Sequence, residues 1–330
     1  MTRIGLVLGA GGAVGHAFHS GVLAALAEET GWDARDAEII VGTSAGSLVG
    51  AFLRAGLSPA DLAARATDAS LSVEGRVLVD RATAATEHLP PIPARPPRRS
   101  GFPAMSAPGA LLRAAFRPWN ARPGTVAAAA LPEGRISTEI ISSGLRAFFD
   151  AWPDRPLWIN AVDLQSSQRV TFGRDGAPAA DVASAVAASC AIPAFFAPVT
   201  IGGVRYVDGG AHSPTNVDLF AGLGFDLVVV SSPMSVARNS FRLAADQPAR
   251  RLSRLALARE VGRVRRAGTH VITFQPTPDD LAVMGVNAMD PSRTADVTRQ
   301  ARVSAHHRLG RADAAERVRM LRAPATRQQA

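Results

Sequence analysis

The sequence contains no lysine, a single cysteine and few aromatic residues. All 36 of its basic residues are arginines, and phenylalanine, tryptophan and tyrosine together make up 5% of its 330 residues. Without lysine the chain cannot form the phosphate-binding loop that ends in Gly-Lys-Ser or Gly-Lys-Thr. The lone Cys190 excludes a disulfide within the chain and is typical of proteins kept in a reducing compartment.

Long apolar runs are also missing. No segment approaches the roughly 20 consecutive apolar residues that a membrane-spanning helix needs. The apolar segment Ile4–Leu8 is too short for the hydrophobic core of a secretion signal. Together with the single cysteine, these features lead us to expect a cytoplasmic protein, with a peripheral position at a membrane as an alternative location.

The arginines give the chain a formal net charge of +8. Guanidinium groups bind phosphates in a bidentate manner, so nucleic acid and anionic membrane surfaces are natural partners of such a charge. The scarcity of aromatic residues and the lack of a recognisable nucleic-acid-binding module argue against nucleic acid. We expect no nucleic-acid partner, at most a transient contact with an anionic membrane surface, and an arginine excess that mainly reflects codon composition.

Short apolar, β-branched runs alternate with segments of helical periodicity along the chain. The runs predict strands at 4–8, 39–41, 157–164, 169–172, 204–207, 227–230 and 271–274. Helices are predicted behind the first two strands, from Pro59 to about Ser70, and at 107–116, 125–130, 138–149, 181–189, 250–266, 291–309 and 311–321. This alternation predicts a three-layer α/β/α fold with a largely parallel central sheet.

Residues 82–104 break this pattern. Five prolines stand at positions 90, 91, 93, 96 and 97, and three arginines lie among or directly after them. Proline removes a backbone donor and fixes its own φ angle, so we expect no regular structure here. We interpret the segment as a surface loop, with a cap whose arginines meet lipid phosphates as the alternative.

The strongest functional signal is the sequence Gly42-Thr43-Ser44-Ala45-Gly46. The β-branched run Ile39–Val41 leads directly into this G-x-S-x-G motif, and a helical segment follows at once. Such a strand–turn–helix context exposes the serine hydroxyl over the first turn of a helix, where the helix dipole favours negative charge. We predict that Ser44 is a nucleophile, and the alternative is a glycine-rich turn that merely caps a helix.

A glycine-rich loop, Gly9-Ala10-Gly11-Gly12-Ala13-Val14-Gly15, joins the first predicted strand to a helix. Backbone N–H groups at a helix N-terminus can bind a phosphate or stabilise an oxyanion. The dinucleotide fingerprint G-x-G-x-x-G does not fit, because Val14 stands in the place of its last glycine. Asp33 or Asp36 could still supply the acidic residue of that fingerprint, so nucleotide binding is the weaker alternative.

A nucleophilic serine needs a base. One possible set follows the order serine, aspartate, histidine, with Asp163 or Asp208 and then His212 or His270. The other possibility is Asp208 alone, which ends a predicted strand and precedes Gly209-Gly210. Ligand sites in open α/β sheets lie at this edge of the sheet. A desolvated carboxylate there could take the serine proton directly.

Four motifs resemble, in order and spacing, those of the patatin-like phospholipase family. They are Gly11-Gly12-Ala13-Val14-Gly15, Gly42-Thr43-Ser44-Ala45-Gly46, an A-S-x-A-x-P-x-x-F-x-P segment at 188–198, and Asp208-Gly209-Gly210. The later segment Met284-Gly285-Val286-Asn287 with Asp290 is also similar to one in bacterial members. The resemblance covers roughly residues 4–290.

The resemblance implies a serine acyl hydrolase of phospholipids or lysophospholipids that needs no metal, cofactor or catalytic histidine. Ser44 would be the nucleophile, Asp208 the base, and the amides of Gly11, Gly12 and Ala13 the oxyanion hole. Residues 4–220 would form the catalytic region, with 82–104 inserted; 221–321 would complete the same domain, and 322–330 would be a disordered tail. The motif-supporting glycines would be Gly15, Gly42, Gly46, Gly209 and Gly210.

Two positions depart from the glycine loop of the family, which usually reads G-G-G-x-R/K-G. Ala10 replaces the first glycine, and Val14 stands where the basic residue is expected. Alanine costs little unless its φ must be positive, whereas Val14 removes a cation beside the expected oxyanion site. Two alternatives to the hydrolase are a non-catalytic anion- or lipid-binding protein on the same fold and, less favoured, a nucleotide-binding oxidoreductase.

Overall fold

The computed structural model describes residues 2–96, 105–111, 123–237 and 244–322. One sheet has the strand order β5-β6-β3-β2-β1-β7-β8, with β4 paired to β3. Strands β3, β2, β1, β7 and β8 are parallel, whereas β4 and β6 run antiparallel to β3. The strands are β1 (Ile4–Leu8), β2 (Ile39–Thr43), β3 (Leu157–Asp163), β4 (Arg169–Phe172), β5 (Val199–Ile201), β6 (Val204–Asp208), β7 (Leu227–Ser231) and β8 (His270–Phe274).

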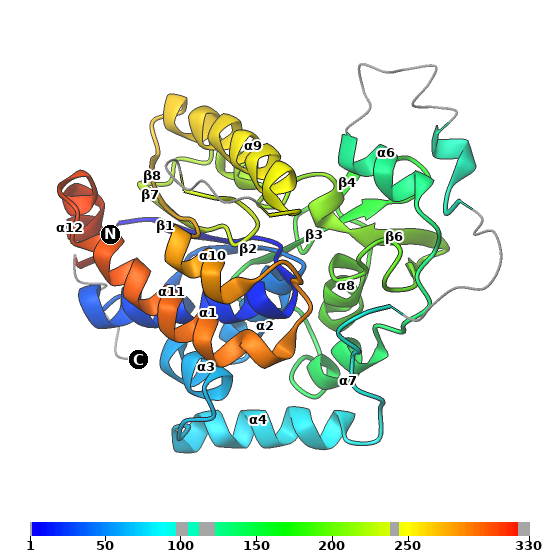
Figure 1. The fold of residues 1–330 in the computed structure, drawn as a ribbon, viewed down its shortest axis with the longest axis horizontal. Coiled ribbons are helices and arrows are strands. Elements are labelled where there is room, and N and C mark those ends of the chain that lie inside the picture. Colours follow the sequence, from blue (N-terminus) through cyan, green and yellow to red (C-terminus); the bar gives the residue numbers. More distant parts are fainter. Residues whose placement is uncertain (1, 97–104, 112–122, 238–243, 323–330) are drawn as a thin grey trace.

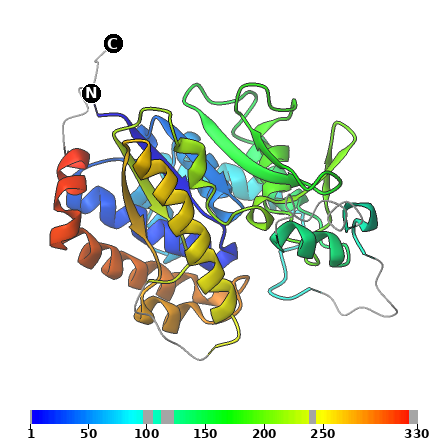
Figure 2. The ribbon, with the colours of Figure 1, turned by 90° about the horizontal axis from the view of Figure 1, so that it is seen from above.

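Helices cover both faces of this sheet, so the predicted α/β/α architecture is confirmed (Figure 1). One face carries α1 (Gly12–Thr30), α2 (Ala45–Arg54), α8 (Val182–Ser189) and α11 (Thr294–Leu309). The other face carries α9 (Gln247–Arg266), which lies nearest the viewer in Figure 2. The strands between the two helical layers are therefore buried on both sides, which explains their continuous apolar runs.

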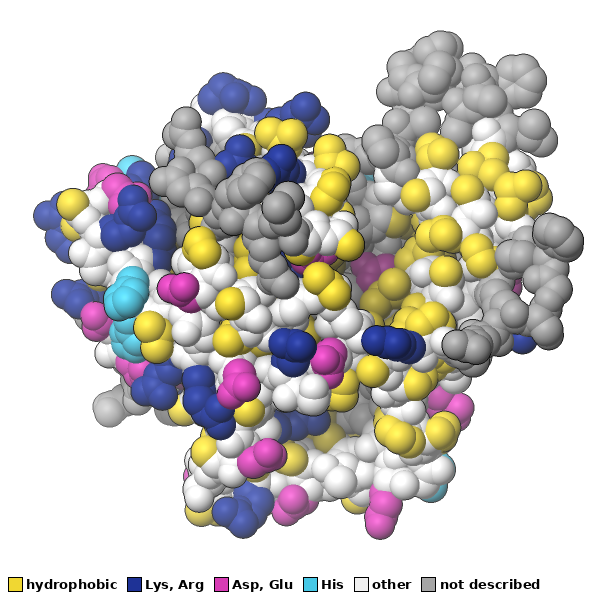
Figure 3. Space-filling view, in the orientation of Figure 1, with side chains coloured by type: hydrophobic (Ala, Val, Ile, Leu, Met, Phe, Trp, Pro, Cys, Tyr) yellow, Lys and Arg dark blue, Asp and Glu magenta, His cyan; other side chains and the backbone are white. Residues whose placement is uncertain are grey.

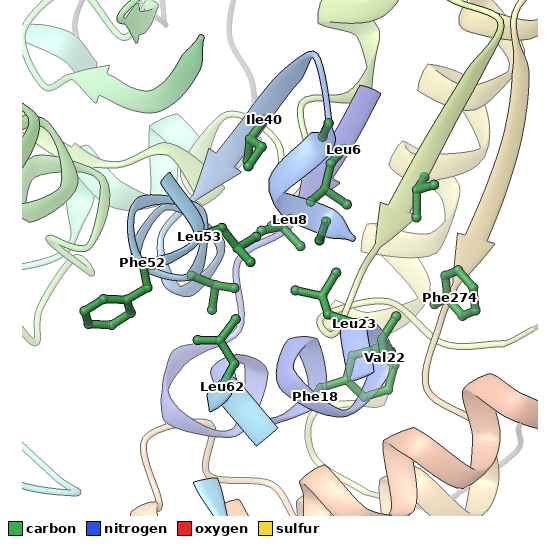
Figure 4. Close-up of a cluster of buried hydrophobic side chains, with 14 of the residues drawn as sticks. Leu6, Leu8, Phe18, Val22, Leu23, Ile40, Phe52, Leu53, Leu62 and Phe274 are labelled. Atoms are coloured by element: carbon green, nitrogen blue, oxygen red, sulfur yellow. The ribbon is translucent and has the colours of Figure 1, made fainter. Parts of the chain in front are cut away.

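Alternate side chains of β1 enter two separate cores. Leu6 and Leu8 pack with Phe18 and Leu23 of α1 in the larger core, which Figure 4 shows in detail. Val7 points the opposite way and packs in the core beneath α9. The period of two that sends neighbouring side chains to opposite faces is that of any β-strand.

Further helices lie around the sheet and its two main helical layers. They are α3 (Pro59–Ala66), α4 (Val73–Thr86), α6 (Pro123–Ala130), α7 (Glu139–Arg146), α10 (Pro278–Met284) and α12 (Ala315–Arg322). The hydroxyl of Ser58 caps α3 as expected, accepting a 3.0 Å hydrogen bond from the N–H of Asp61. The helix ends at Ala66, four residues before the predicted end at Ser70.

Helix α4 corrects the predicted irregular segment. The irregular segment is predicted to begin at residue 82, but the helix continues to Thr86. Ser72 caps its N-terminus by accepting a 2.9 Å hydrogen bond from the N–H of Gly75, and the partly buried Leu78 and Val79 pack against the larger core. No proline occurs between Pro59 and Pro90, so no proline interrupts the helix.

Beyond α4 the structure describes the proline-rich segment only as far as residue 96, and there it has no helix or strand. Its carbonyl at Ala94 accepts a 3.1 Å hydrogen bond from the side chain of Asn287. Ile92 packs against a small cluster that includes Phe196 and Met289. Residues outside the described ranges include Arg98, Arg99, the second half of the predicted helix 107–116 (112–116) and the tail from 323 onward.

Candidate active site

Ser44 occupies a sharp turn between β2 and α2. Its φ and ψ angles are 53° and −123°, a conformation that non-glycine residues rarely adopt. The neighbouring glycines make this turn possible. A Cβ at Gly46 would lie 2.0 Å from the carbonyl oxygen of Leu8, and one at Gly42 would lie 2.4 Å from Cα of Ser47. The G-x-S-x-G spacing therefore reflects close backbone contacts as well as sequence resemblance.

Hydrogen bonds from two other elements hold the backbone of Ser44. Its N–H donates to the hydroxyl of Ser189 at 2.9 Å, and that hydroxyl donates to the carbonyl of Asn160 at 2.6 Å. The carbonyl of Ser44 accepts a 2.7 Å bond from the hydroxyl of Ser47. These bonds connect the turn to α8 and β3. The serine of the A-S-x-A segment, Ser189, is thus the residue that holds the backbone of Ser44 in place.

Asp208 lies at the end of β6, opposite Ala161 of β3. Its side chain is buried, and burial raises the pKa of its carboxyl to about 6. A side-chain hydrogen bond from Ser44 and a 2.7 Å bond from the N–H of Gly210 act in the opposite direction by favouring the ionised form. The structure therefore brings together the two side chains that the sequence analysis paired.

The glycine loop contains three consecutive backbone N–H groups that are not used by any residue the structure describes. In the part of the chain that the structure describes, the N–H groups of Gly11, Gly12 and Ala13 have no hydrogen-bond acceptor. The flanking amides of Ala10 and Val14 are used, by the carbonyls of Pro214 and Ala288. Gly12 and Ala13 line the same cavity as Ser44. The first amides of a helix have no partner within it, so they are available to a ligand.

The two departures from the family pattern have different consequences. Ala10 does not have a positive φ, so its methyl group imposes no backbone strain. Val14 is 2% exposed and belongs to the larger core, so no cation stands at that position of the loop.

The late segment that contains Asn287 packs against this loop. A Cβ at Gly12 would lie 2.6 Å from the carbonyl oxygen of Ala288 and 2.9 Å from the sulfur of Met289. The carbonyl of Ala288 also accepts the 3.0 Å bond from Val14. This contact explains why a segment so far along the chain carries a recognisable motif.

A cavity of about 490 Å³ opens beside Ser44. Its walls come from α1, α2, α3, α4 and α7, from the segment after α8, and from residues 91–92 and 289–294. Most of the lining side chains are apolar: Leu48, Phe52, Ile92, Ile140, Ile141, Leu145, Ile192, Phe196 and Met289. Such a lining suits a hydrocarbon chain.

The other candidates for a catalytic set have different roles or positions. Asp163 holds the turn between β3 and β4 by accepting a 2.8 Å bond from the N–H of Gln165. His270 lies 3.9 Å from Glu316, and His212 follows directly after the short turn of 3-10 helix at Gly209–Ala211.

Two further histidines lie near the glycine loop, and burial keeps both uncharged. His16 lines the cavity and has a pKa of about 3, lowered by burial and by Arg65. Behind it, His19 has a pKa of about 4 and contacts the carbonyl of Gly9 at 2.8 Å. Among the described residues, no three histidine, cysteine or carboxylate side chains gather closely enough to hold a metal ion.

The loop that follows Asp208 depends on polar residues that the sequence analysis did not identify. Asn216 donates a 3.0 Å hydrogen bond to the hydroxyl of Thr43, next to Ser44. Buried Glu260 of α9 accepts bonds from the hydroxyl of Thr215 and the N–H of Val217. The one available signal was that Glu260 is the single acidic residue in the arginine-rich segment 250–266.

Comparisons with known proteins agree with this geometry at the level of the family. The family model described as patatin-like phospholipase matches residues 6–221. No curated protein matches the chain. In the part of the chain that the structure describes, no helix is long and apolar enough to cross a membrane.

Two solved structures are similar in fold. VipD from Legionella pneumophila shares 14% sequence identity with a TM-score of 0.45, and the match covers 94% of this chain and 67% of that one. The type III effector protein ExoU shares 16% identity with a TM-score of 0.35, and the match covers 93% of this chain and 53% of that one. The chain thus spans about half the length of ExoU.

Proposed function

Because this chain belongs to the patatin-like phospholipase family, we propose that it hydrolyses carboxyl esters of phospholipids or lysophospholipids through an acyl-Ser44 intermediate. Membership of this family supports the hydrolysis of lipid acyl esters in general. The assignment of Ser44 as nucleophile, of Asp208 as base and of the Gly11–Ala13 amides as oxyanion hole is our own proposal.

One observation carries the proposal: the hydroxyl of Ser44 bonds to a buried carboxylate whose pKa is raised to about 6. A general base works best when its pKa lies near the pH of the reaction. An exposed aspartate, with a pKa near 3.9, would be a weak proton acceptor. Burial of Asp208 therefore supplies the basicity that a histidine provides in a three-residue triad.

The proposed reaction has two halves. As Ser44 Oγ attacks the ester carbonyl, Asp208 takes the hydroxyl proton, and the unpartnered amides of Gly11–Ala13 stabilise the oxyanion of the tetrahedral intermediate. When the C–O bond breaks, protonated Asp208 gives its proton to the leaving alcohol. Water then attacks the acyl-Ser44 ester, its proton passes to Asp208, and collapse of the second intermediate returns a proton to Ser44 with release of the fatty acid.

The surface beside the cavity supports transient contact with a membrane. Figure 3 shows hydrophobic side chains gathered over the part of the molecule that carries α6, β6 and α7. Exposed apolar residues of α4 and of the region before α7 include Val73, Val77, Met105 and Leu131. Because α4 also lines the cavity, contact through this side would place lipid near the entrance. The cytoplasmic location expected from the sequence stays a prediction.

Labelling with a fluorophosphonate probe tests the nucleophile. We expect the wild-type protein to be labelled and Ser44→Ala to be unlabelled, with the exposed Ser70→Ala as a matched control that keeps full labelling. Absence of labelling in folded wild-type protein would contradict the hydrolase and favour the non-catalytic lipid-binding alternative.

Hydrolysis of p-nitrophenyl esters tests the base. Asp208→Asn should abolish turnover, whereas His212→Ala and His270→Ala should keep most of it. Loss of activity in a histidine variant with Asp208→Asn still active would show that the base is wrongly assigned. Tight binding of NAD(H) or NADP(H), in place of ester hydrolysis, would support the nucleotide-binding alternative.

A further inference from the structure

Arg65 is a cation inside an otherwise uncharged cavity. It lies near the end of α3, and of the described residues that line the cavity it alone is an aspartate, glutamate or arginine. Its side chain is exposed to solvent as well as to the cavity, and the protein around it is still close enough to lower the pKa of its guanidinium. Arginine nevertheless stays protonated at neutral pH.

This guanidinium has no anionic partner. Among the described residues, no ion pair or hydrogen bond involves the Arg65 side chain. The nearest acid on its own helix, Asp61, is occupied by the hydroxyls of Ser58 and Ser72, at 2.6 Å and 2.9 Å. The residues outside the described ranges contain no aspartate or glutamate. An unpaired, solvent-accessible guanidinium in a cavity wall is available to an anion that enters the cavity.

Contacts with aromatic rings fix the position of Arg65 relative to the glycine loop. Its guanidinium carbon lies 5.1 Å from the centre of the Phe52 ring, a cation–π contact. The imidazole of His16 packs edge-on against the same ring, at 6.2 Å between centres. His16 lies one helical turn after Gly12 and Ala13. Arg65 and His16 therefore contact the same ring, and both line the cavity that Gly12, Ala13 and Ser44 also line.

We propose that Arg65 binds the phosphate group of a phospholipid substrate and so gives the enzyme a preference for phospholipids over neutral acyl esters. The inference rests on the proposed function and names the residue that sets its preference among acyl esters. A guanidinium matches phosphate oxygens in a bidentate manner. A glycerophospholipid carries its phosphate on the same glycerol unit as the scissile ester, so one cavity can hold both groups.

Paired substrates with one acyl chain test this assignment. Lysophosphatidylcholine and monoacylglycerol, both palmitoyl esters, differ in the phosphate-containing headgroup. Arg65→Met keeps an unbranched apolar stem and removes the charged guanidinium, so kcat/KM for the lysophospholipid should fall about tenfold or more, the loss expected for a charge-assisted hydrogen bond. This loss of kcat/KM should appear mainly as a higher KM. For monoacylglycerol kcat/KM should change less than about threefold.

Two further variants complete the comparison. Arg65→Lys keeps the charge without the planar fork and should recover part of the lysophospholipid activity. Arg76→Met removes an exposed arginine of α4 that does not line the cavity, and both activities should be unchanged. Equal losses on both substrates in Arg65→Met would show that Arg65 acts through packing on Phe52, and unchanged activity would also overturn the proposal.

A binding measurement separates this inference from the proposed reaction. Hexadecylphosphocholine contains the phosphate but no ester, and hexadecylglycerol lacks the phosphate. Calorimetric titration should show at least about tenfold weaker binding of the phosphocholine to Arg65→Met, with hexadecylglycerol unaffected. This result would support the role of Arg65 even in a protein that hydrolyses no ester. Equal phosphocholine affinities, or Arg65-dependent binding of inorganic phosphate alone without any preference between the lipids, would contradict it.

Discussion

The backbone N–H of Ser44 donates a 2.9 Å hydrogen bond to the hydroxyl of Ser189, 145 positions further along the chain. Ser189 is fully buried, and its hydroxyl in turn donates a 2.6 Å hydrogen bond to the carbonyl of Asn160. One hydroxyl therefore satisfies two buried backbone groups and joins the turn after β2 to α8 and β3. The unusual conformation of Ser44 is held in part by this connection.

Ser189→Ala should lower both stability and activity. The substitution leaves the N–H of Ser44 without its acceptor, and a buried unsatisfied group costs about 1–3 kcal/mol. We expect the free energy of unfolding to fall by that amount in urea titrations. The rate of fluorophosphonate labelling should fall about tenfold as the turn loosens. A labelling rate equal to that of wild type would show that Ser189 does not position the nucleophile.

Gly46→Ala should disrupt the turn directly. The new Cβ would lie 2.0 Å from the carbonyl oxygen of Leu8, a backbone atom that cannot move aside as a flexible side chain could. We expect a loss of about 3 kcal/mol or more in unfolding free energy, together with loss of labelling. Gly262→Ala is the matched control, because its Cβ meets only a side-chain nitrogen of Arg266 at 3.4 Å. That helical substitution should stabilise by about 0.5–1 kcal/mol. A Gly46→Ala protein as stable as wild type would contradict the packing argument.

The pH dependence of hydrolysis should follow the carboxyl of Asp208. The ionised form is the proposed base and its pKa is about 6, so kcat/KM should rise with pH through 6 and level off above 7. Below pH 5 it should fall about tenfold for each pH unit. Initial rates with p-nitrophenyl butyrate, on protein shown to be folded by circular dichroism, measure this profile. A profile that is flat between pH 4.5 and 8 would argue against Asp208 as the base.

Asp208→Asn should stabilise the fold at alkaline pH while removing activity. The pKa of Asp208 is raised on folding by roughly two units, so its ionised form opposes folding by about 3 kcal/mol once the pH exceeds 6. In the unfolded chain the carboxyl of Asp208 has a pKa near 3.9. At pH values below this, Asp208 is neutral in both the folded and the unfolded protein, and the cost is absent. The gain in unfolding free energy should therefore be largest at pH 8 and should disappear toward pH 4. Destabilisation at pH 8 would indicate that the carboxylate is held favourably.

Ile141→Trp should shorten the range of acyl chains that the enzyme accepts. Ile141 of α7 lines the cavity, and a larger ring there would fill space that a long chain needs. We expect kcat/KM for p-nitrophenyl palmitate to fall about tenfold or more, and that for the butyrate to change less than about threefold. Val303→Trp, on the exposed side of α11, is the control and should change neither value. Equal losses of kcat/KM for the palmitate and the butyrate would show that the acyl chain does not bind beside Ile141.

Much of the fold and of the candidate site was accessible from sequence because the signals are local. The strands around β1 are buried on both faces, which requires continuous apolar runs such as Ile4–Leu8. Gly42 and Gly46 are needed where backbone approaches backbone, and Asp208 precedes two glycines at a strand end. Each requirement is met within a few residues, so each leaves a readable pattern.

Other features followed no local pattern. Helix α4 was missed because the proline-rich sequence beyond it suggested an earlier break, although no proline interrupts Val73–Thr86. The short strand β5 was not predicted, since it pairs only with β6 at the edge of the sheet. The bonds of Glu260 to the loop after Asp208 join segments more than 40 positions apart, and nothing in either segment indicates the other.

The sequence by itself determined the α/β class, the family, and Ser44 and Asp208 as candidates, because backbone turns and buried strands constrain residues that are neighbours in the chain. Only the tertiary structure decided that these two side chains meet. It also decided that Val14 belongs to the core and that Arg65 enters the cavity without a partner. Burial and pairing depend on the whole set of surrounding atoms, which only the folded chain brings together.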